Sequence, residues 1–493
     1  MSNQMRQCKY YDICRLTDEA DPGAGLCILH SHSTKKNAEV FNQAFARHRE
    51  QNGRNFSHMV FPGDVDFQGT PFTREVSFHN VKFTAQVNFA KATFAEAVDF
   101  TDAISAEVAD FGNTAFSKRA DFREARFEGS ASFLSIIFSG DADFYAVEFL
   151  GEVLFDHATF SQTAIFSFAK FTQQADFVGA NFAQNATFEG AKFAGRVDFD
   201  LASFMANSSF RWAEFLSTAT FQMTLFKGTS ADFMSSSFRD RAVFAARVNE
   251  GGKVHIFSGV DVDFSFVIVD PPDVLSFIEA DMRRCELMYT DLRKIQLAGV
   301  IWPRIPHRLV TYIPRIRGRI GVYDEIFHSR SEPDYPWDLI ERLYRELKQN
   351  YEDRRDYERA GDFHYGEKEM RRSNPATPLG LRFWLTLYRF AGGYGERYLP
   401  PLIWSAVLLV LSAIGYIAFG LRLKSEQGGA FLALTSIWDW LLTFNYSLRV
   451  MTFLRPDDLV PVGCAKLINT VQSLFGPVFL GLFGLALRQR LKR

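Results

Sequence analysis

The stretch that decides the fold is ADFGNTAFSKRADFREARFEGSASFLSIIFSGDADF, residues 109–144, in which phenylalanine recurs at alternating steps of five and six residues. One series of phenylalanines runs every eleven residues from Phe67 to Phe221 and fills all fifteen of its positions. A second series runs from Phe72 to Phe226 at the same interval, and only Ser105 departs from it. Chance does not produce such regularity, so the segment is an internal repeat.

Steps of five and six residues fit neither a regular helix nor one long strand. In an α-helix these steps rotate by about 140° and 240°, so the rings would leave one face. A strand alternates with a period of two. A chain that turns a corner every five or six residues places one phenylalanine of each short side inward, and four sides give a coil of 22 residues. Each ring is then expected to stack on the ring 22 residues later.

This pattern resembles the Phe-rich variant of the pentapeptide-repeat superfamily, in which every second repeat has a six-residue step. The resemblance covers residues 56–266 and implies a right-handed four-sided β-helix, a β-solenoid. Some nine coils at about 4.8 Å give a rod of roughly 40–45 Å. A stack of this kind needs caps, and residues 267–335 are expected to form a degenerate final coil and a linker.

Aspartates directly precede many of the inward phenylalanines and recur on two opposed faces of the expected rod. The repeat region holds 26 acidic and 16 basic residues, and one interpretation is an acidic surface that mimics DNA. The other is that short polar side chains satisfy backbone groups at the corners. We favour the second interpretation, because uncharged polar residues take the same position in the repeat: Asn88, Ser132, Thr187 and Ser209. We therefore expect the rod to bind an unidentified protein or ligand and not nucleic acid.

Four residues near the start of the chain have the spacing C-x5-C-x12-C-x2-H: Cys8, Cys14, Cys27 and His30. Three thiolates and one imidazole suit tetrahedral Zn²⁺, and four protein ligands indicate a structural site. His32 is an alternative to His30, and unligated cysteines on a frayed tail are the alternative to a metal site. We expect one structural zinc ion per chain in an N-terminal cap, residues 1–35, followed by a capping helix within residues 36–55.

Two helical segments follow the solenoid. Residues 336–374 predict a helical hairpin with a leucine stripe at Leu339, Leu343 and Leu347. Its charged residues are interpreted as a solvated helix face, not as a site: Glu367, Glu369, Arg371 and Arg372. Residues 375–398 contain an aromatic-rich stretch that is expected to lie at a membrane surface, with Arg382 and Arg389 at the lipid headgroups.

The last segment, residues 399–493, predicts two membrane spans. Leu402–Leu421 carries no charge over twenty residues and Leu467–Leu487 is nearly as apolar, so each can cross a lipid bilayer of about 30 Å. Because the first residues are polar, no signal peptide is expected. We therefore expect a multi-pass protein of the inner membrane with its N-terminal domains and C-terminus in the cytoplasm. Phe431–Met451 between the spans is expected to be a re-entrant helix.

The layout of span, re-entrant helix, loop and span resembles the two-transmembrane pore module of potassium channels. The glycine-containing filter is missing, because Thr452–Asp457 stands in its place, so potassium selectivity is not expected. Asn469 and Gln472 would line either a water-filled pore or a polar seam between helices. The full set of pore residues predicted by this resemblance is Arg449, Arg455, Asp457, Asp458, Asn469, Gln472, Gly476 and Gly481.

Two functions follow from the sequence. The favoured one is a homo-oligomeric ion pore, most simply a tetramer, coupled to a cytoplasmic sensor or docking rod. The alternative is a membrane-tethered scaffold whose rod binds a protein partner without conducting ions. The near-neutral balance of 55 basic and 57 acidic residues gives no general argument for a nucleic-acid partner. No nucleophile, acid pair or phosphate loop is found, so an enzyme is not expected.

Overall fold

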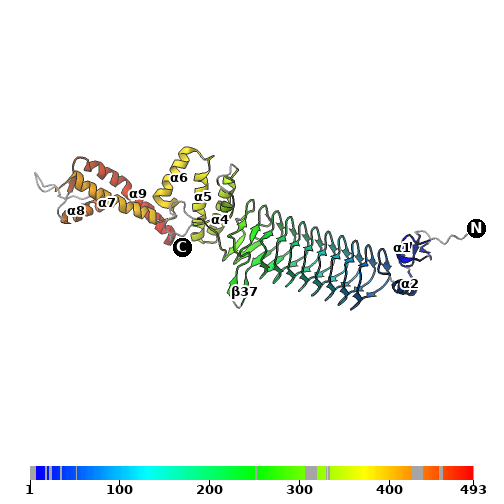
Figure 1. Ribbon diagram of the computed structural model, residues 1–493. Coiled ribbons are helices and arrows are strands. Elements are labelled where there is room, and N and C mark those ends of the chain that lie inside the picture. The colour runs from blue at the N-terminus through cyan, green and yellow to red at the C-terminus, as the bar shows by residue number, and fades with distance from the viewer. Residues whose placement is uncertain are drawn as a thin grey trace, which may run out of the picture. The chain divides into compact units, whose positions relative to one another are not determined.

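The computed structural model of the chain contains two compact units (Figure 1). The first comprises Met1–Arg304 with Val322–Phe327, and the second comprises Ile305–Gly321 with His328–Arg493. The structure describes residues 7–16, 19–21, 25–33, 36–51, 53–249, 252–305, 319–328, 330, 334–423, 437–454 and 459–491.

The first unit is a β-solenoid built from four parallel sheets, which confirms the predicted four-sided fold (Figure 1). One coil consists of four two-residue strands, and in the regular part each strand pairs with the strand 22 residues later, as Val98 does with Ala120. We name each sheet after its first strand: β3 (Val60–Phe61), β4 (Val65–Asp66), β5 (Pro71–Phe72) and β6 (Val76–Ser77). The sheets contain 10, 11, 8 and 10 strands and end at β40 (Ile268–Val269), β43 (Gln296–Ala298), β33 (Leu225–Phe226) and β42 (Cys285–Glu286).

Stacked phenylalanines fill the interior of the coils. Phe144 is fully buried and lies parallel to Phe122 and Phe166, with ring centroids 4.8 Å apart in both pairs. It also meets Phe133 edge to face at 5.6 Å. Ser105 is buried too, and it interrupts one ring column, because its strand neighbours are Phe residues of the β3 sheet on both sides. The predicted stacking at 22 residues is therefore confirmed.

The aspartates before the inward rings bind the backbone at the corners. The Oδ1 atom of Asp66 accepts a hydrogen bond from the backbone N–H of Gln68 at 2.9 Å, and Asp99 accepts one from Thr101 at 2.9 Å. Asp66 lies in the β4 sheet and Asp99 in the β6 sheet, which are opposite sides of the coil. These contacts support the corner interpretation of the acidic positions.

The solenoid becomes irregular after Phe226 but continues past residue 266. Ser208 pairs with Ala231, so one extra residue is accommodated in that coil. A hairpin of β37 (Arg247–Asn249) and β38 (Gly252–Val254) lengthens the next coil. The stack then continues through the stretch predicted to be degenerate, because Phe277 pairs with Leu297 in the last strand of the β4 sheet.

The N-terminal end of the solenoid is covered by helix α2 (Ala38–Glu50). Asn37 caps this helix by accepting a hydrogen bond from the backbone N–H of Val40 at 3.2 Å. Phe45 of α2 lies 5.1 Å from Phe61 and 6.4 Å from Phe67, which belong to the first coil. The helix thus supplies the rings that an additional coil would otherwise supply.

The second unit is helical. In its hairpin Ile340, Leu343 and Leu347 form the buried stripe, whereas Leu339, predicted for that stripe, lies half-buried at its edge. A short antiparallel pair, β46 (Leu421–Leu423) and β47 (Leu459–Pro461), joins the C-terminal helices. The helices are α4 (Trp337–Asp353), α5 (Tyr357–Ser373), α6 (Leu379–Gly392), α7 (Leu399–Phe419), α8 (Ile437–Met451) and α9 (Ala465–Leu491), with one 3-10 turn, η1 (Gly393–Gly395).

In the part of the chain that the structure describes, two helices, α7 and α9, are long and apolar enough to cross a membrane. Helix α8 packs against both of them. At 15 residues it is about 22 Å long, too short to span a bilayer. Helix α6 exposes a face that contains Phe383 and Trp384.

Removing one stacked ring should destabilise the solenoid. We expect Phe144→Ala to lower the free energy of unfolding by about 3–5 kcal/mol, because the ring is fully buried between two parallel neighbours and the vacated space cannot be filled. The matched control is Tyr145→Ala, since Tyr145 is adjacent in the chain but exposed. Denaturation of the full chain followed by circular dichroism measures both, and equal stability of the two variants would contradict the stacking account.

Candidate functional site

The four predicted metal ligands meet in one buried cluster. Cys8 precedes helix α1 (Tyr11–Cys14), Cys14 ends it, and Cys27 ends strand β2 (Leu26–Cys27). β2 pairs with β1 (Glu19–Asp21). The turn after β2 is tight, because the backbone N–H of His30 donates to the Cys27 carbonyl at 3.1 Å. One ligand atom from each of the four side chains lies within 4.8 Å of the others.

The distances within this cluster match a tetrahedral site. The Sγ atoms of Cys14 and Cys27 are 3.7 Å apart, and His30 Nδ1 is 3.2 Å from Cys27 Sγ and 3.6 Å from Cys8 Sγ. Four ligands at about 2.3 Å from a common ion would have edges of roughly 3.8 Å. His32 is exposed and stands outside the cluster. The cluster can therefore hold a metal ion through His30, as expected.

Two of the three cysteines in the cluster have raised pKa values. The hydrogen bond with the Cys14 thiol, and then burial, raise the pKa of Cys27 to about 11. Burial raises the pKa of Cys8 as well, whereas the hydrogen bond with Cys27 lowers the pKa of Cys14, so Cys8 and Cys27 favour the neutral thiol form. A bound metal ion reverses this preference, since it stabilises the thiolate forms.

Lys36 connects the metal cluster to the solenoid, and sequence reasoning missed it. Its Nζ atom donates to the carbonyl of Leu29, between two ligands, at 3.1 Å and to that of Val60, in the first coil, at 2.6 Å. The same atom lies 4.8 Å from the centre of the Phe41 ring of α2. Burial lowers the pKa of Lys36 to about 7. A lone lysine gives no signal in the sequence, because only the fold brings these carbonyls together.

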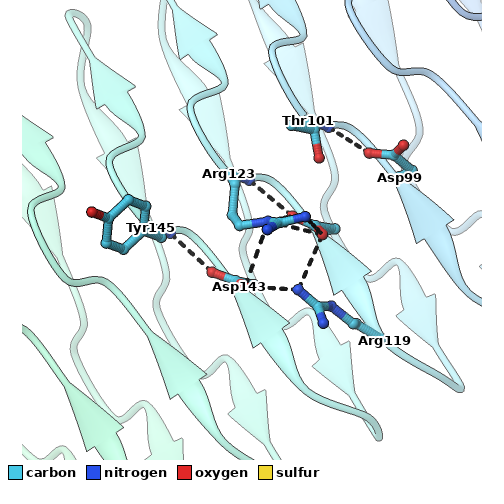
Figure 2. A network of polar contacts seen from close by, with 7 residues as sticks. Asp99, Thr101, Arg119, Arg123, Asp143 and Tyr145 are labelled. Atoms are coloured by element: carbon cyan, nitrogen blue, oxygen red, sulfur yellow. Dashed lines mark hydrogen bonds and ion pairs between the residues drawn. The ribbon is translucent and has the colours of Figure 1, made fainter.

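Acidic side chains on the β6 sheet are largely engaged within the chain (Figure 2). Arg119 donates to both Asp121 and Asp143, at 3.1 and 2.9 Å. Arg123 donates to Asp121 at 2.8 Å, and Asp143 also accepts from the backbone N–H of Tyr145. Two guanidinium groups thus neutralise two stacked carboxylates in this part of the rod.

The interpretation of Glu367 and Glu369 as part of a solvated face is wrong, because both are buried. Glu369 accepts hydrogen bonds from the Tyr394 hydroxyl at 2.7 Å and from Arg372 at 3.0 Å, and it pairs with Arg389 at 3.3 Å. Arg389 is therefore directed at a carboxylate and not at lipid headgroups as predicted. The sequence does not show that α6 and η1 fold back onto this face of α5.

Glu367 sits in a second buried charge cluster between α4 and α5. It pairs with Arg345 at 3.4 Å and with Lys368 at 3.5 Å, and lies 3.6 Å from His364. Burial raises its pKa, but the nearby His364 and lysine side chains outweigh burial and lower the pKa to about 2. Arg371, from the same predicted set, is exposed. Ion pairs between the buried carboxylate of Glu367 and partly exposed basic side chains thus hold the hairpin together with its apolar stripe.

Gln472 belongs to a buried polar seam between the three C-terminal helices. Its Oε1 atom accepts a hydrogen bond from the Tyr416 hydroxyl at 2.8 Å, and its Nε2 atom donates to Ser447 Oγ at 2.6 Å. Asn469 Oδ1 accepts from the Tyr446 hydroxyl at 3.3 Å. Of the two alternatives for Asn469 and Gln472, this structure of a single chain places them in a polar seam. Sequence reasoning missed the tyrosines, although a hydroxyl within an apolar span is a signal for such a seam.

The other predicted pore residues fall into three groups. Gly476 is a site of close helix packing, because a Cβ atom there would lie 2.8 Å from Met451 Cγ of α8. Gly481 has open space around it, and Arg449 is half-buried on α8. Arg455, Asp457 and Asp458 lie outside the described residues.

The face of α9 that turns away from the seam is mainly apolar. Thr470 and Lys466 are its exposed polar members in the first two turns. The exposed large side chains on this helix are Leu467, Val471, Leu474, Phe475, Val478 and Leu485. Such a face suits contact with lipid or with another apolar helix.

Comparison with known families supports the identity of the rod. The family model for pentapeptide repeats (9 copies) matches residues 56–104 and 155–203. The match and the four-sided solenoid together support pentapeptide repeats in this segment. No curated protein and no solved structure matches the chain. The comparison therefore supports pentapeptide repeats in the rod, and two apolar helices among the described residues suggest association with a membrane.

Replacing Gln472 should destabilise the helical unit. In Gln472→Leu the buried Tyr416 hydroxyl and Ser447 Oγ lose a partner, which we expect to cost about 0.5–2 kcal/mol. Thr470→Val is the matched control, because Thr470 is polar but exposed on the same helix. Thermal unfolding of the detergent-solubilised protein measures the difference, and indistinguishable melting of the two variants would remove Gln472 from the seam.

Proposed function

We propose that the chain is a membrane-anchored scaffold, whose helical unit is held in a lipid bilayer and whose pentapeptide-repeat rod binds a protein partner. The observation that carries this proposal is the engagement of Gln472. Its amide is used by Tyr416 and Ser447 within one chain, and the free face of α9 is mainly apolar. A water-filled pathway is normally lined by polar groups. In these helices the polar side chains of Gln472, Tyr416 and Ser447 instead form hydrogen bonds with one another.

The exposed apolar surfaces fit this anchoring. In the proposal α7 and α9 cross the inner membrane, α8 enters it part way, and the face of α6 with Phe383 and Trp384 lies among the headgroups. Two crossings put both ends of the unit on one side. The basic residues after Leu487 favour the cytoplasm for that side.

A non-potassium-selective ion pore is the second candidate. The observation that favours it is α8, a helix of half-membrane length that packs against both spans, as in the two-transmembrane pore layout. Such a pore would need several copies of the chain, with a tetramer as the simplest assembly. Its lumen would have to be lined by residues other than Asn469 and Gln472.

For the metal cluster we propose a single structural Zn²⁺ per chain. Three soft thiolates and an imidazole are the donors that zinc prefers, and four protein ligands leave no open position for catalysis. The ion would fold the N-terminal segment and, through Lys36, fasten it to α2 and the first coil. We propose no enzymatic activity.

Reconstitution into planar bilayers separates the two candidates. The scaffold predicts no unitary current at any voltage or salt gradient, with a potassium channel reconstituted in parallel as the positive control. Protease protection of the protein in lipid vesicles of the same composition as the planar bilayer shows that it has inserted. Reproducible unitary currents that purified wild-type protein adds to the bilayer would reject the scaffold in favour of the pore.

Metal analysis tests the zinc proposal. We expect inductively coupled plasma mass spectrometry to find one zinc ion per purified chain. Cys27→Ser should lose that zinc, because the substitution removes one of the four ligands and its thiolate charge. Cys464→Ser is the control, since Cys464 is exposed and outside the cluster. Full zinc content in Cys27→Ser, or another metal in the wild type, would refute the assignment.

A further inference from the structure

At one corner of the solenoid, exposed aromatic residues adopt a backbone conformation that is unfavourable for bulky side chains. The corner residue that follows each β6-sheet strand has a positive φ in most coils, and this residue is Phe168 (58°), Trp212 (55°), Phe266 (58°) and Tyr289 (64°) in four of them. Their exposed fractions are 49, 51, 44 and 50 %. Bulky residues rarely adopt this backbone conformation, and exposed rings do not contribute to the core. Packing in the core therefore does not explain them.

The equivalent corner on the opposite side provides a comparison. The residues that follow the β4-sheet strands have the same positive φ, as in Leu201 (62°) and Met223 (58°). Among the described residues, no exposed phenylalanine, tyrosine or tryptophan stands at that corner in the regular coils. The aromatic rings are thus a property of one corner and not of the repeat.

A column of carboxylates runs beside the aromatic corner. Asp232 of β34 (Ser230–Asp232) is in register with Asp263 of β39 (Asp261–Asp263), which is in register with Glu286 of β42. Neighbouring strands lie about 4.8 Å apart, so three acidic side chains are stacked on the outer face of the β6 sheet. Like charges in register repel one another and favour a bound cation.

Elsewhere on this face the chain supplies that cation itself. Arg119 and Arg123 neutralise the earlier pair Asp121 and Asp143 (Figure 2). Further along, Arg211 Nε lies 3.3 Å from Asp232, and the same guanidinium lies 5.4 Å from the centre of the Trp212 ring. The rod thus already shows how a guanidinium fits between the carboxylate column and the aromatic corner.

In the last coils the ring and the carboxylate are present without the arginine. The residues that correspond to Arg211, one before the corner, are Ser265 and Met288. Next to them the rings of Phe266 and Tyr289 stack at 4.2 Å and 12°. In the described part of the chain, neither Asp263 nor Glu286 forms an ion pair with a lysine, arginine or histidine.

Buried negative charge lies next to these coils. Asp324 is fully buried, and its Oδ1 atom accepts hydrogen bonds from the backbone N–H groups of Leu287 and Met288 at 3.0 and 3.1 Å. Its Oδ2 atom has no hydrogen-bond partner among the described residues. Burial, and then repulsion by Asp263 and Asp324, raise the pKa of Glu286 to about 7. Among the described residues, no ion pair to a basic side chain is made by Asp263, Glu286 or Asp324 at this end of the column.

We propose that an arginine-rich segment of a partner protein docks on these last coils, with its guanidinium groups stacked on the exposed rings and paired with the carboxylates. Arginine fits better than lysine because its planar guanidinium stacks on rings and binds carboxylates with two donors. This inference rests on the proposed scaffold role and names the surface and the chemistry of the partner. The site consists of Asp263, Phe266, Glu286 and Tyr289.

Binding of a fluorescein-labelled hexa-arginine peptide to the full chain in nanodiscs tests the site, with hexa-lysine as the comparison peptide. By fluorescence anisotropy at physiological salt, Tyr289→Ala and Glu286→Gln should each weaken binding of hexa-arginine about tenfold, as expected for loss of one cation–π contact or one charge pair. Leu201→Ala, at the opposite corner, and Glu152→Gln, an exposed acid away from the column, should bind like the wild type. All four positions are on the surface or at its edge, and unchanged thermal unfolding verifies that the variants are folded.

Wild-type affinity in both Tyr289→Ala and Glu286→Gln would overturn the site. Equal affinity for hexa-lysine would overturn the assignment to guanidinium groups. The test is independent of the bilayer recordings. Unitary currents together with the expected loss of peptide binding would reject the scaffold and retain the docking site, whereas silent bilayers with unchanged peptide binding would reject the docking site alone.

Discussion

The stacking of phenylalanine rings at the spacing of β-strands is the interaction on which the first unit depends. Parallel strands lie about 4.8 Å apart, and rings such as Phe122, Phe144 and Phe166 repeat at 4.8 Å with nearly parallel planes. Strands of two residues have almost no stability alone. The backbone ladder and the ring columns therefore hold one another in register, and each coil is stable only between two others. This mutual dependence explains why the ends of the stack need separate solutions.

At the N-terminal end, that solution combines aromatic packing with a buried cluster of three cysteines and one histidine that could hold a metal ion. Helix α2 offers Phe45 to the first coil, while a segment with little apolar content is organised around Cys8, Cys14, Cys27 and His30. Lys36 joins the two by donating to carbonyls on both sides. A small segment without a core needs this kind of support, because the area it buries does not offset its loss of conformational entropy.

In the second unit the dominant constraint is that polar groups in an apolar environment must find partners. Gln472, Tyr416 and Ser447 satisfy one another across three helices. In the hairpin, Glu369 accepts hydrogen bonds from the hydroxyl of Tyr394 and from Arg372, and it forms an ion pair with Arg389. A buried polar or charged group without a partner would destabilise the folded state by far more than each pair stabilises it. These contacts therefore fix how the helices pack. The outer surfaces are left apolar, which is the property that suits a bilayer.

The sequence by itself determined the repeat, the coil of 22 residues, the set of cysteine and histidine residues that cluster, and two long apolar helices, because each depends on local spacing or composition. The tertiary structure decided which side chains meet across the fold. It buried Glu367 and Glu369, turned Arg389 away from the headgroups and directed Gln472 into a seam, and it brought Lys36 to the carbonyls of Leu29 and Val60. A charged or amide side chain has the same local pattern whether it faces water or a partner from a distant segment. Only the packing of those segments sets its solvation and hence its role.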